Sequence, residues 1–373
     1  MASAVHKLRP EDQARIGKAL VGKDLKGFAW TQTNGHVIYT WEDGKWDEGR
    51  FEHDPYIRCH IMSNCFHYGQ ACFEGQKAFH LKDGRVCIFN DKANALRMQM
   101  SNTRMMMPLV PVEMFQKALD WVVHENLEYL PTYDMKGCSL YIRPFCIGVG
   151  DLITPVPSNK FHFVVMVMPV GSYYAVGKNL NAVDGVVIEE FDRAAPRGVG
   201  NVKVAGNYGA DIYPAYKYKK LKGFPLPLYL DPKEKRYIEE FNTSNFAAIT
   251  KDGTYITSES AAILDSITNR CLQVLAHEMN VPVERRPIDF DAEVSTFDEV
   301  GAIGTAVVIT PCKSLTRGET KYHFSEPKIL QQLYDRITAI QRGDAEDRYN
   351  WLRELGEVHL PKEGQYIQQN GYH

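Results

Sequence analysis

A single lysine stands in a setting that suits covalent chemistry. Lys203 lies between Val202 and Val204, in a segment that also carries glycines at positions 198, 200 and 206. An amine that is withdrawn from water into an apolar wall has a lowered pKa and can attack a carbonyl group, as Schiff-base chemistry requires. The plainer alternative is a lysine on a half-exposed strand whose ammonium group reaches water, and the pattern alone favours that alternative.

Charged residues also occur in two strand-like segments. Arg143 interrupts the apolar stretch SLYIRPF. A buried guanidinium group either binds an anionic ligand or forms a salt bridge with a carboxylate of the chain, and the two alternatives have equal weight. Glu239 and Glu240 are neighbours in RYIEEF, so we expect one side chain to face the solvent and the other to face inward. An inward carboxylate needs a protonated partner, for example a pyridinium nitrogen.

Hydroxyl groups and backbone amides could supply an anion site. Ser266, Ile267 and Thr268 begin a predicted helix. The free N–H groups at a helix N-terminus bind phosphate, although serine and threonine cap most helices in any case. Thr305 lies in a glycine-flanked turn, where most threonines only bond their own backbone. Arg97 lies on a helical pattern, so by itself we expect it to be solvated.

Apolar periodicity indicates the elements that must position these side chains. In the first half we expect strands at 27–31, 36–41, 139–149 and 160–170, a hairpin of 72–79 with 85–89, and helices over 91–107 and 112–130. In the second half we expect strands at 183–191, 227–230, 236–241, 245–250 and 254–257, a helix over 266–279, a buried strand pair over 300–311 and an outer helix from 326.

This mixture of helices and strands predicts an α/β protein built from two α+β domains, because hairpins outnumber regular βαβ units. A chain of 373 residues is long enough for two domains. We expect a smaller N-terminal domain at 1–169, an interdomain connector at 170–182 and a larger C-terminal domain at 183–373.

The composition excludes several classes of protein. Lys and Arg number 43 against 46 Asp and Glu, a formal net charge of −3, which gives no electrostatic case for binding nucleic acid. No apolar run approaches the roughly 20 residues of a membrane span. The N-terminus lacks an apolar signal core, so we expect a cytoplasmic protein, with the mitochondrion as the alternative. The 8 cysteines and 12 histidines show no metal-ligand spacing, so no metal is expected.

Several segments together resemble the branched-chain-amino-acid aminotransferases, which are enzymes of fold type IV that depend on pyridoxal 5′-phosphate (PLP). The matching segments are FHYGQACFEGQKAF, NALRM, SLYIRPF, RAAPRGVGNVKVAGNYGA, EEFNTSNF, DSITNRCL and EVGAIGTAVVITP. They occur in the family's order and at its spacing from about residue 27 to 345. The resemblance implies the fold of D-amino-acid aminotransferase, with its smaller N-terminal and larger C-terminal domain.

The resemblance also implies a role for each matching cofactor-site residue. Lys203 would bind the aldehyde of PLP covalently and then move the proton between the substrate Cα and the cofactor. Glu240 would keep the pyridine nitrogen protonated, and Tyr208 would bond the phenolic oxygen. The phosphate would be held by Arg97, Ile267, Thr268 and Thr305.

For the substrates, the resemblance implies one pocket that accepts both an apolar side chain and the distal carboxylate of glutamate. Phe73, Tyr68 and Tyr141 would offer apolar faces, and Arg143 would pair with the glutamate carboxylate. Thr243 and the backbone of Ala306 would grip the α-carboxylate. The family is homodimeric, and Tyr68 with the loop around Leu152 and Thr154 would reach toward the neighbouring subunit's site.

The expected reaction is transamination of L-leucine, L-isoleucine or L-valine with 2-oxoglutarate, giving branched-chain 2-oxo acids and L-glutamate. Alternatives within the fold are D-amino-acid or R-amine transaminases, aminodeoxychorismate lyases and an enzyme for a specialised keto acid. Ser244 leaves the last of these open, because a larger residue often occupies its position. A binding homologue without catalysis is a further alternative. A single Cys312 replaces the paired redox cysteines of some members, so we predict no thiol switch.

Overall fold

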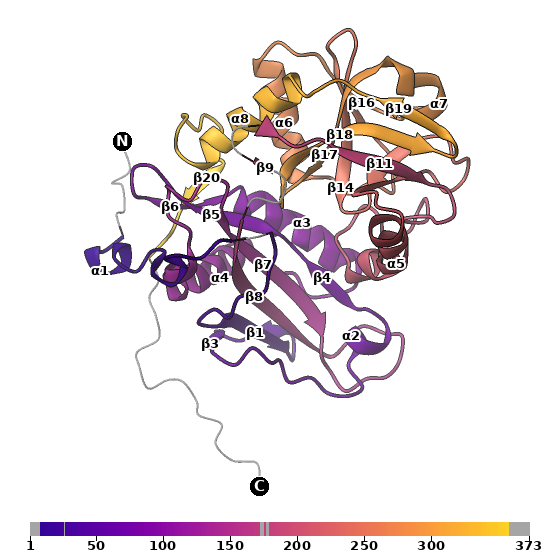
Figure 1. Cartoon of the computed structure of the whole chain (residues 1–373). Coiled ribbons are helices and arrows are strands. Elements are labelled where there is room, and N and C mark those ends of the chain that lie inside the picture. Colours follow the sequence, from indigo (N-terminus) through magenta and orange to yellow (C-terminus); the bar gives the residue numbers. More distant parts are fainter. Residues whose placement is uncertain (1–7, 26, 172–174, 177–178, 358–373) are drawn as a thin grey trace.

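The computed structural model describes residues 8–25, 27–171, 175–176 and 179–357. The chain forms two lobes, each built around a β-sheet (Figure 1). In the first lobe the strand order is β2-β1-β8-β7-β5-β6-β20, with β3 paired to β1 and β4 to β7. These strands are β1 His36–Glu42, β2 Lys45–Trp46, β3 Arg50–Glu52, β4 Ala71–Phe73, β5 Gln76–His80, β6 Val86–Phe89, β7 Ser139–Gly148, β8 Lys160–Val170 and β20 Leu352–Glu354.

The second sheet has the order β13-β12-β11-β18-β17-β14-β15-β16, and β13 also pairs with β14. That additional pairing closes six of the strands into a ring, so the strands of the ring have few exposed edges. β11 runs parallel to both β12 and β18. The strands are β11 Val183–Ile188, β12 Leu226–Leu230, β13 Ile238–Phe241, β14 Ser244–Thr250, β15 Tyr255–Ser258, β16 Val283–Arg286, β17 Phe297–Gly304, β18 Val308–Arg317 and β19 Thr320–His323.

Helices cover both sheets. Those of the first lobe are α1 Pro10–Gln13, α2 Asn64–His67, α3 Asp91–Arg104 and α4 Val112–Glu125, with short 3₁₀ turns η1 Lys18–Leu20 and η2 Leu127–Tyr129. Those of the second are α5 Ala205–Ala215 with the π-helical η3 Tyr216–Leu221, α6 Ile267–Glu278, α7 Phe290–Glu293 with η4 Val294–Thr296, and α8 Ile329–Gln341. Between the lobes lie the short strands β9 Ala175–Val176 and β10 Asn179–Leu180.

Apolar spacing explains why the main helices form where they do. On α4, Phe115, Ala118, Leu119 and Val122 recur at helical spacing, and all four side chains are fully buried in the core of the first lobe. Helix α8 shows the same spacing, with four side chains fully buried in the core of the second lobe: Leu330, Leu333, Ile337 and Ile340. Each helix therefore buries one apolar stripe, which is the main contribution of such helices to stability.

Most of the predicted elements are confirmed, and the differences have local causes. No strand forms at 27–31. The predicted strand 72–79 is divided into β4 and β5 at Glu74 and Gly75, because Glu74 is buried in an ion pair and its neighbour packs against Tyr141. Lys203 lies on no strand but immediately before α5, which the sequence pattern did not predict.

The end of the described chain returns to the first lobe. β20 pairs antiparallel with β6, and Arg353 on β20 forms ion pairs with Asp91 and Asp120. This corrects the assignment of the whole of 183–373 to a C-terminal domain, because the returning strand completes the N-terminal sheet. The connector at 170–182 lies partly outside the described residues, and the remaining boundaries stay a prediction. Within the described residues, no helix has the length and apolar character needed to cross a membrane.

Candidate active site

A cavity of about 650 Å³ opens between the two lobes. Its volume lies within the range of small-molecule sites. Strands of both sheets, the start of α5 and the turn between β17 and β18 contribute its walls. Ten of the predicted site residues line it: Phe73, Arg97, Tyr141, Arg143, Lys203, Tyr208, Glu240, Thr243, Thr305 and Ala306.

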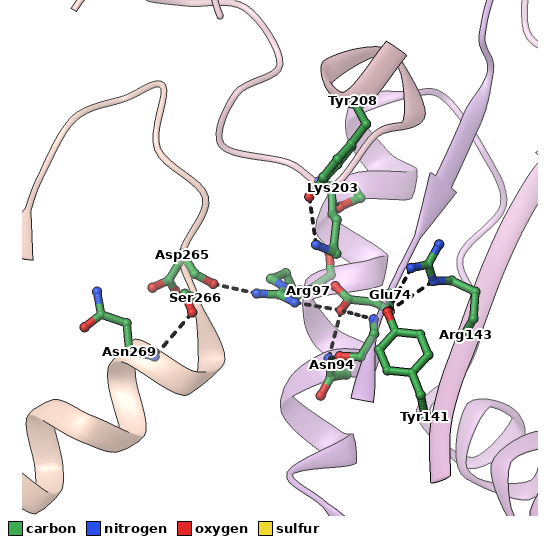
Figure 2. Close-up of polar contacts among 12 residues, drawn as sticks. Glu74, Asn94, Arg97, Tyr141, Arg143, Lys203, Tyr208, Asp265, Ser266 and Asn269 are labelled. Carbon is green, nitrogen blue, oxygen red and sulfur yellow. Dashed lines mark hydrogen bonds and ion pairs between the residues drawn. The ribbon is translucent and has the colours of Figure 1, made fainter. Parts of the chain in front are cut away.

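Lys203 is held firmly at this cavity by its backbone. Its N–H donates to the Ser101 hydroxyl at 2.9 Å, and its carbonyl accepts from the N–H of Phe73 at 3.1 Å. Its Nζ donates to the hydroxyl of Tyr208 at 2.9 Å (Figure 2). At Gly200 a Cβ would lie 2.1 Å from the carbonyl oxygen of Ala262, so only glycine permits this path of the chain. The lysine therefore projects from a fixed backbone into the space between the lobes.

The Glu240 carboxylate forms a buried wall of the same cavity and is only 2% exposed. One oxygen accepts from Arg193 at 2.9 Å and from the N–H of Leu264 at 3.0 Å, while the other accepts from the side chain of Asn245 at 3.0 Å. Burial raises the pKa of Glu240, and the Arg193 guanidinium offsets part of this effect. A carboxylate with a raised pKa has a strong tendency to share a proton with a base placed beside it.

Glu239 is also buried, at 2% exposed, so the expectation that one of the two neighbouring glutamates faces solvent is wrong. All four residues of β13 are buried, so neither glutamate faces solvent. One oxygen of Glu239 accepts from Ser260 at 3.2 Å, and the other has no hydrogen-bond partner in the described ranges. Burial raises the pKa of Glu239 to about 7.

Arg97 is not solvated as its helical pattern alone suggested; it is 7% exposed. Its Nε and Nη2 donate to the two carboxylate oxygens of Glu74 at 2.8 and 2.7 Å, and its Nη1 donates to the carbonyl of Asp265 at 2.9 Å (Figure 2). Burial alone would raise the pKa of Glu74, but the Arg97 guanidinium lowers it overall. Arg97 thus lies at the cavity with its charge already paired to Glu74. Its bond to Asp265 connects α3 to the segment that leads into α6.

The N-terminus of α6 adjoins this arginine. Ser266 caps the helix by accepting from the N–H of Asn269 at 3.2 Å. None of the hydrogen bonds within the described residues uses the N–H of Ile267 or Thr268, as expected in the first turn of a helix. Both residues border a small cavity that shares Gly75 and Thr305 with the main one. They therefore lie behind the main cavity and not on its open surface.

Thr305 and Ala306 lie in the turn between β17 and β18. Nζ of Lys77 donates to the carbonyl of Ala306 at 2.8 Å, which joins the turn to β5 of the other lobe. Val308 ends the turn with φ of +66°, a conformation that is rare for a β-branched residue. Such strain persists only where the surroundings hold it, and it is concentrated at functional sites.

Arg143 faces the cavity from β7. Its Nη2 donates to the hydroxyl of Tyr141 at 2.9 Å (Figure 2), and its guanidinium carbon lies 4.5 Å from the centre of the Phe73 ring. It forms no salt bridge within the described ranges, which leaves the ligand-binding alternative for this residue. At Gly75 a Cβ would lie 2.2 Å from the Tyr141 hydroxyl, so glycine makes room for the tyrosine.

Besides Ile267 and Thr268, three predicted residues do not line the cavity: Tyr68, Leu152 and Thr154. They nevertheless lie in connected segments of the first lobe. Tyr68 follows α2, and Asn64 on α2 donates to the carbonyls of Val156 at 2.6 Å and Thr154 at 3.4 Å. A single chain therefore does not bring these residues to its own site.

Sequence reasoning missed several residues that hold the site in place. Five of them were not predicted: Glu74, Arg193, Asn245, Ser101 and Lys77. All but Ser101 lie in segments that carry the family resemblance. The one usable signal was the unpaired charge: a buried Glu240 and a buried Arg97 each require a partner of opposite charge. Nothing local identified Arg193 or Glu74 as those partners.

The class IV aminotransferase family model matches residues 71–315. The chain is 40% identical over 332 residues to the branched-chain-amino-acid aminotransferase of Helicobacter pylori, covering 88% of this chain and 96% of that protein. This chain belongs to the class IV aminotransferase family. It is an aminotransferase with PLP as its cofactor, as the resemblance implied.

Two other curated relatives of this aminotransferase show how wide the similarity is. The branched-chain-amino-acid aminotransferase of Haemophilus influenzae is 40% identical over 338 residues, covering 87% of this chain and 96% of that protein. The aminotransferase atnJ of Emericella nidulans is 36% identical over 340 residues, again covering 87% of this chain and 96% of that protein.

Solved structures confirm the predicted fold type for this aminotransferase. The branched-chain amino acid aminotransferase of Escherichia coli matches with a TM-score of 0.71 at 22% identity, covering 86% of this chain and 100% of that chain. The branched-chain aminotransferase of Thermoproteus uzoniensis matches with a TM-score of 0.72 at 20% identity and the same coverage of 86% and 100%.

The residues of the cavity fit the cofactor of this family. Lys203 provides an amine within hydrogen-bond distance of a phenol, and Glu240 provides a buried carboxylate with a raised pKa. The first N–H groups of α6 provide donors for an anion near a guanidinium group. A carbonyl, a basic ring nitrogen and a phosphate thus each have a matching group.

Proposed function

We propose that this aminotransferase exchanges the amino group of L-leucine, L-isoleucine or L-valine with 2-oxoglutarate. The observation that carries the proposal is the arrangement of Arg143, Tyr141 and Phe73. It places a cation that has no carboxylate partner among the described residues against two aromatic rings. Such a surface accepts an apolar side chain against the rings and the distal carboxylate of glutamate at the cation. One pocket can therefore take both substrates.

The resemblance to the family gives each residue in the cofactor half of the site a role, and the geometry supports these roles. When bound, PLP supplies an aldehyde that accepts the amino group and a protonated ring that takes up the electron pair left on the substrate Cα. Lys203 would hold the aldehyde covalently and then, as a free amine, carry the proton at Cα. Glu240 would keep the ring nitrogen protonated, with Arg193 and Asn245 orienting its carboxylate. Tyr208 would donate to the phenolic oxygen.

The phosphate would lie at the N-terminus of α6, held by Ile267, Thr268, Thr305 and Arg97. The substrate's α-carboxylate would lie at the turn of Ala306, opposite Thr243. Both groups of residues line or border the cavity, which supports these assignments. Because Glu74 already neutralises Arg97, the helix N-terminus would supply more of the phosphate's stabilisation than the arginine does.

A second substrate class remains a candidate. Ser244 lines the cavity as a small, half-buried residue, and the relative atnJ carries no branched-chain designation. Extra room at this wall favours a larger or different keto acid. D-amino acids and R-amines are the other candidates, while the retained Lys203 and Glu240 argue against a binding homologue without catalysis.

We also propose that the enzyme is a homodimer. Exposed apolar side chains lie on the α2 region and on the loop of Leu152 and Thr154. They are Ile61, Phe66, Tyr68, Ile153 and Val156. An exposed apolar patch of this kind marks a protein interface. Tyr68, Leu152 and Thr154 would then complete the partner's site. The cytoplasmic location stays a prediction.

A panel of amino donors tests the reaction directly. Purified enzyme is supplied with L-leucine, L-isoleucine, L-valine, D-alanine and an R-amine, each with 2-oxoglutarate, after its visible spectrum has been recorded. We expect the branched-chain L-amino acids to react fastest and Lys203→Ala to lose both turnover and the absorption of the lysine-bound cofactor. Preferential turnover of D-alanine would contradict the substrate class, and survival of that absorption in Lys203→Ala would contradict the role of the lysine.

A further inference from the structure

Gln76 is a buried carboxamide without a hydrogen-bond partner. Its side chain is 1% exposed, and neither Oε1 nor Nε2 is bonded to any group in the described part of the chain. An unsatisfied buried amide is unfavourable, and apolar side chains of similar volume avoid that penalty. Most buried polar groups in native proteins do have partners. Its presence therefore indicates a partner that the polypeptide itself does not provide.

The position of Gln76 indicates where that partner lies. It is the first residue of β5, and it lines a small space of about 20 Å³, enough for one water molecule. Ile267 and Thr268 form another wall of the same space, and Gly75 and Thr305 separate it from the main cavity. The amide, the start of α6 and the Thr305 turn thus surround one small polar space.

The start of α6 is the anion-binding end of a twelve-residue helix with N–H groups that no described residue accepts. Arg97 does not line this space, but its Nη1 donates to the carbonyl of Asp265, two residues before the helix begins. The unbonded donors at the space therefore come from Gln76 on β5 and from the first turn of α6. The strong acceptor that the proposed function places there is the phosphate group of PLP.

We propose that Gln76 is a further residue that holds the phosphate of PLP, donating from Nε2 through a single water in the space it lines. This inference rests on the proposed placement of the phosphate at the N-terminus of α6. The water accepts from Nε2 of the amide and donates to a phosphate oxygen, and such bridged contacts are nearly as favourable as direct ones. In the holoenzyme the buried Nε2 donor then has a partner.

Paired titrations of the apoenzyme with PLP and with pyridoxal test this role, because pyridoxal lacks only the phosphate. We expect Gln76→Met to raise the Kd for PLP about tenfold and to leave the Kd for pyridoxal unchanged. Gln76→Glu should weaken PLP further, since it places a negative charge beside the phosphate. Ser139→Ala is the matched control: Ser139 also has a buried, unbonded hydroxyl, but it lies away from the main cavity.

Thermal melting provides a readout independent of activity. The apo form of Gln76→Met should melt at the same temperature as the apo wild type or higher, because the unsatisfied amide is gone. The rise in Tm on adding PLP or inorganic phosphate should be smaller for the variant than for the wild type. Equal losses of PLP and pyridoxal affinity, or an unchanged PLP Kd in both Gln76 variants, would overturn the proposal. If wild-type enzyme bound PLP no better than pyridoxal, the placement of the phosphate itself would fall as well.

Discussion

Arg143 is a cation that faces the active-site cavity with a tyrosine hydroxyl and two aromatic rings as its neighbours. A guanidinium group in this setting distinguishes substrates by charge, because the rings serve any apolar side chain. Replacement of Arg143 by Gln should therefore lower kcat/KM for glutamate by ten- to a hundredfold, as expected from about 1.5–3 kcal/mol for a charge-assisted hydrogen bond. The same change should alter kcat/KM for leucine by less than about threefold.

Initial rates with the two amino donors measure this difference. Arg143→Lys is a suitable control because it keeps the charge and loses the planar fork. Similar losses for leucine and glutamate would mean that Arg143 supports the strand and not the glutamate carboxylate.

Glu239 makes the stability of the protein depend on pH. Its pKa is raised by burial from 4.5 to about 7, so the folded chain retains a proton that the unfolded chain releases at lower pH. Stability should therefore fall as pH rises from about 4.5 to about 7 and stay lower above that range. Replacement by Gln should remove this decline and make the variant more stable than the wild type at pH 8, by up to about 3 kcal/mol.

Urea unfolding at pH 5 and pH 8 tests the sign of this effect. Glu234→Gln is the matched control, since Glu234 is an exposed carboxylate nearby. If Glu239→Gln lowered stability equally at both pH values, the buried carboxylate would be acting as a hydrogen-bonding group and not as a titrating one.

At the scale of elements, the turn between β17 and β18 combines strain and a long-range anchor. Val308 has a positive φ, and Lys77 on the other lobe donates to the carbonyl of Ala306. The turn also lines the cavity where we place the substrate's α-carboxylate. The bond from Lys77 thus fixes a conformation that valine disfavours by about 1–3 kcal/mol.

Replacement of Lys77 by Met should therefore raise KM for the amino acid several-fold and change kcat less, because the turn loses its anchor and the catalytic amine does not. Adding Val308→Gly to that variant should recover part of the loss, since glycine adopts the same conformation without strain. Steady-state kinetics of the single and double variants provide the measurement. Lys136→Met is the control. Lys136 lines a neighbouring cavity together with Lys77 and Ala306, but it forms no bond to the turn among the described residues, so this change should leave KM unchanged.

At the scale of the whole molecule, the described chain ends by joining the sheet with which it began. Arg353 on β20 is ion-paired to Asp91 and to the buried Asp120, and so connects the C-terminal segment with α3 and α4. Burial raises the pKa of Asp120, and Arg353 counteracts that effect. Removing the arginine would leave two carboxylates in a poorly hydrated place.

Replacement of Arg353 by Met should lower the free energy of unfolding by about 3 kcal/mol, as is typical when one partner of a buried ion pair is removed. Urea unfolding measures the loss. Arg348→Met, which breaks an exposed pair with Glu346, should cost less than about 1 kcal/mol. Equal effects of the two changes would show that β20 adds little to the first lobe.

Some of this protein could be predicted from local patterns alone. The strand β8 has the predicted bounds, and α3, α4, α6 and β7 lie where apolar periodicity placed them. The residues later found around one cavity were also recognisable one by one, but each had an ordinary alternative. Their combination followed from the resemblance of whole segments to a family, which the comparisons confirm.

The tertiary structure decided which charges are buried and with whom they pair. Arg97 on a helix and Glu239 on a strand both looked like surface residues, and both are buried because other elements cover them. The pairs of Arg97 with Glu74 and of Glu240 with Arg193 join segments that only folding brings together. A local pattern reports which face of an element is apolar, whereas burial and pairing depend on contacts between elements distant in the chain.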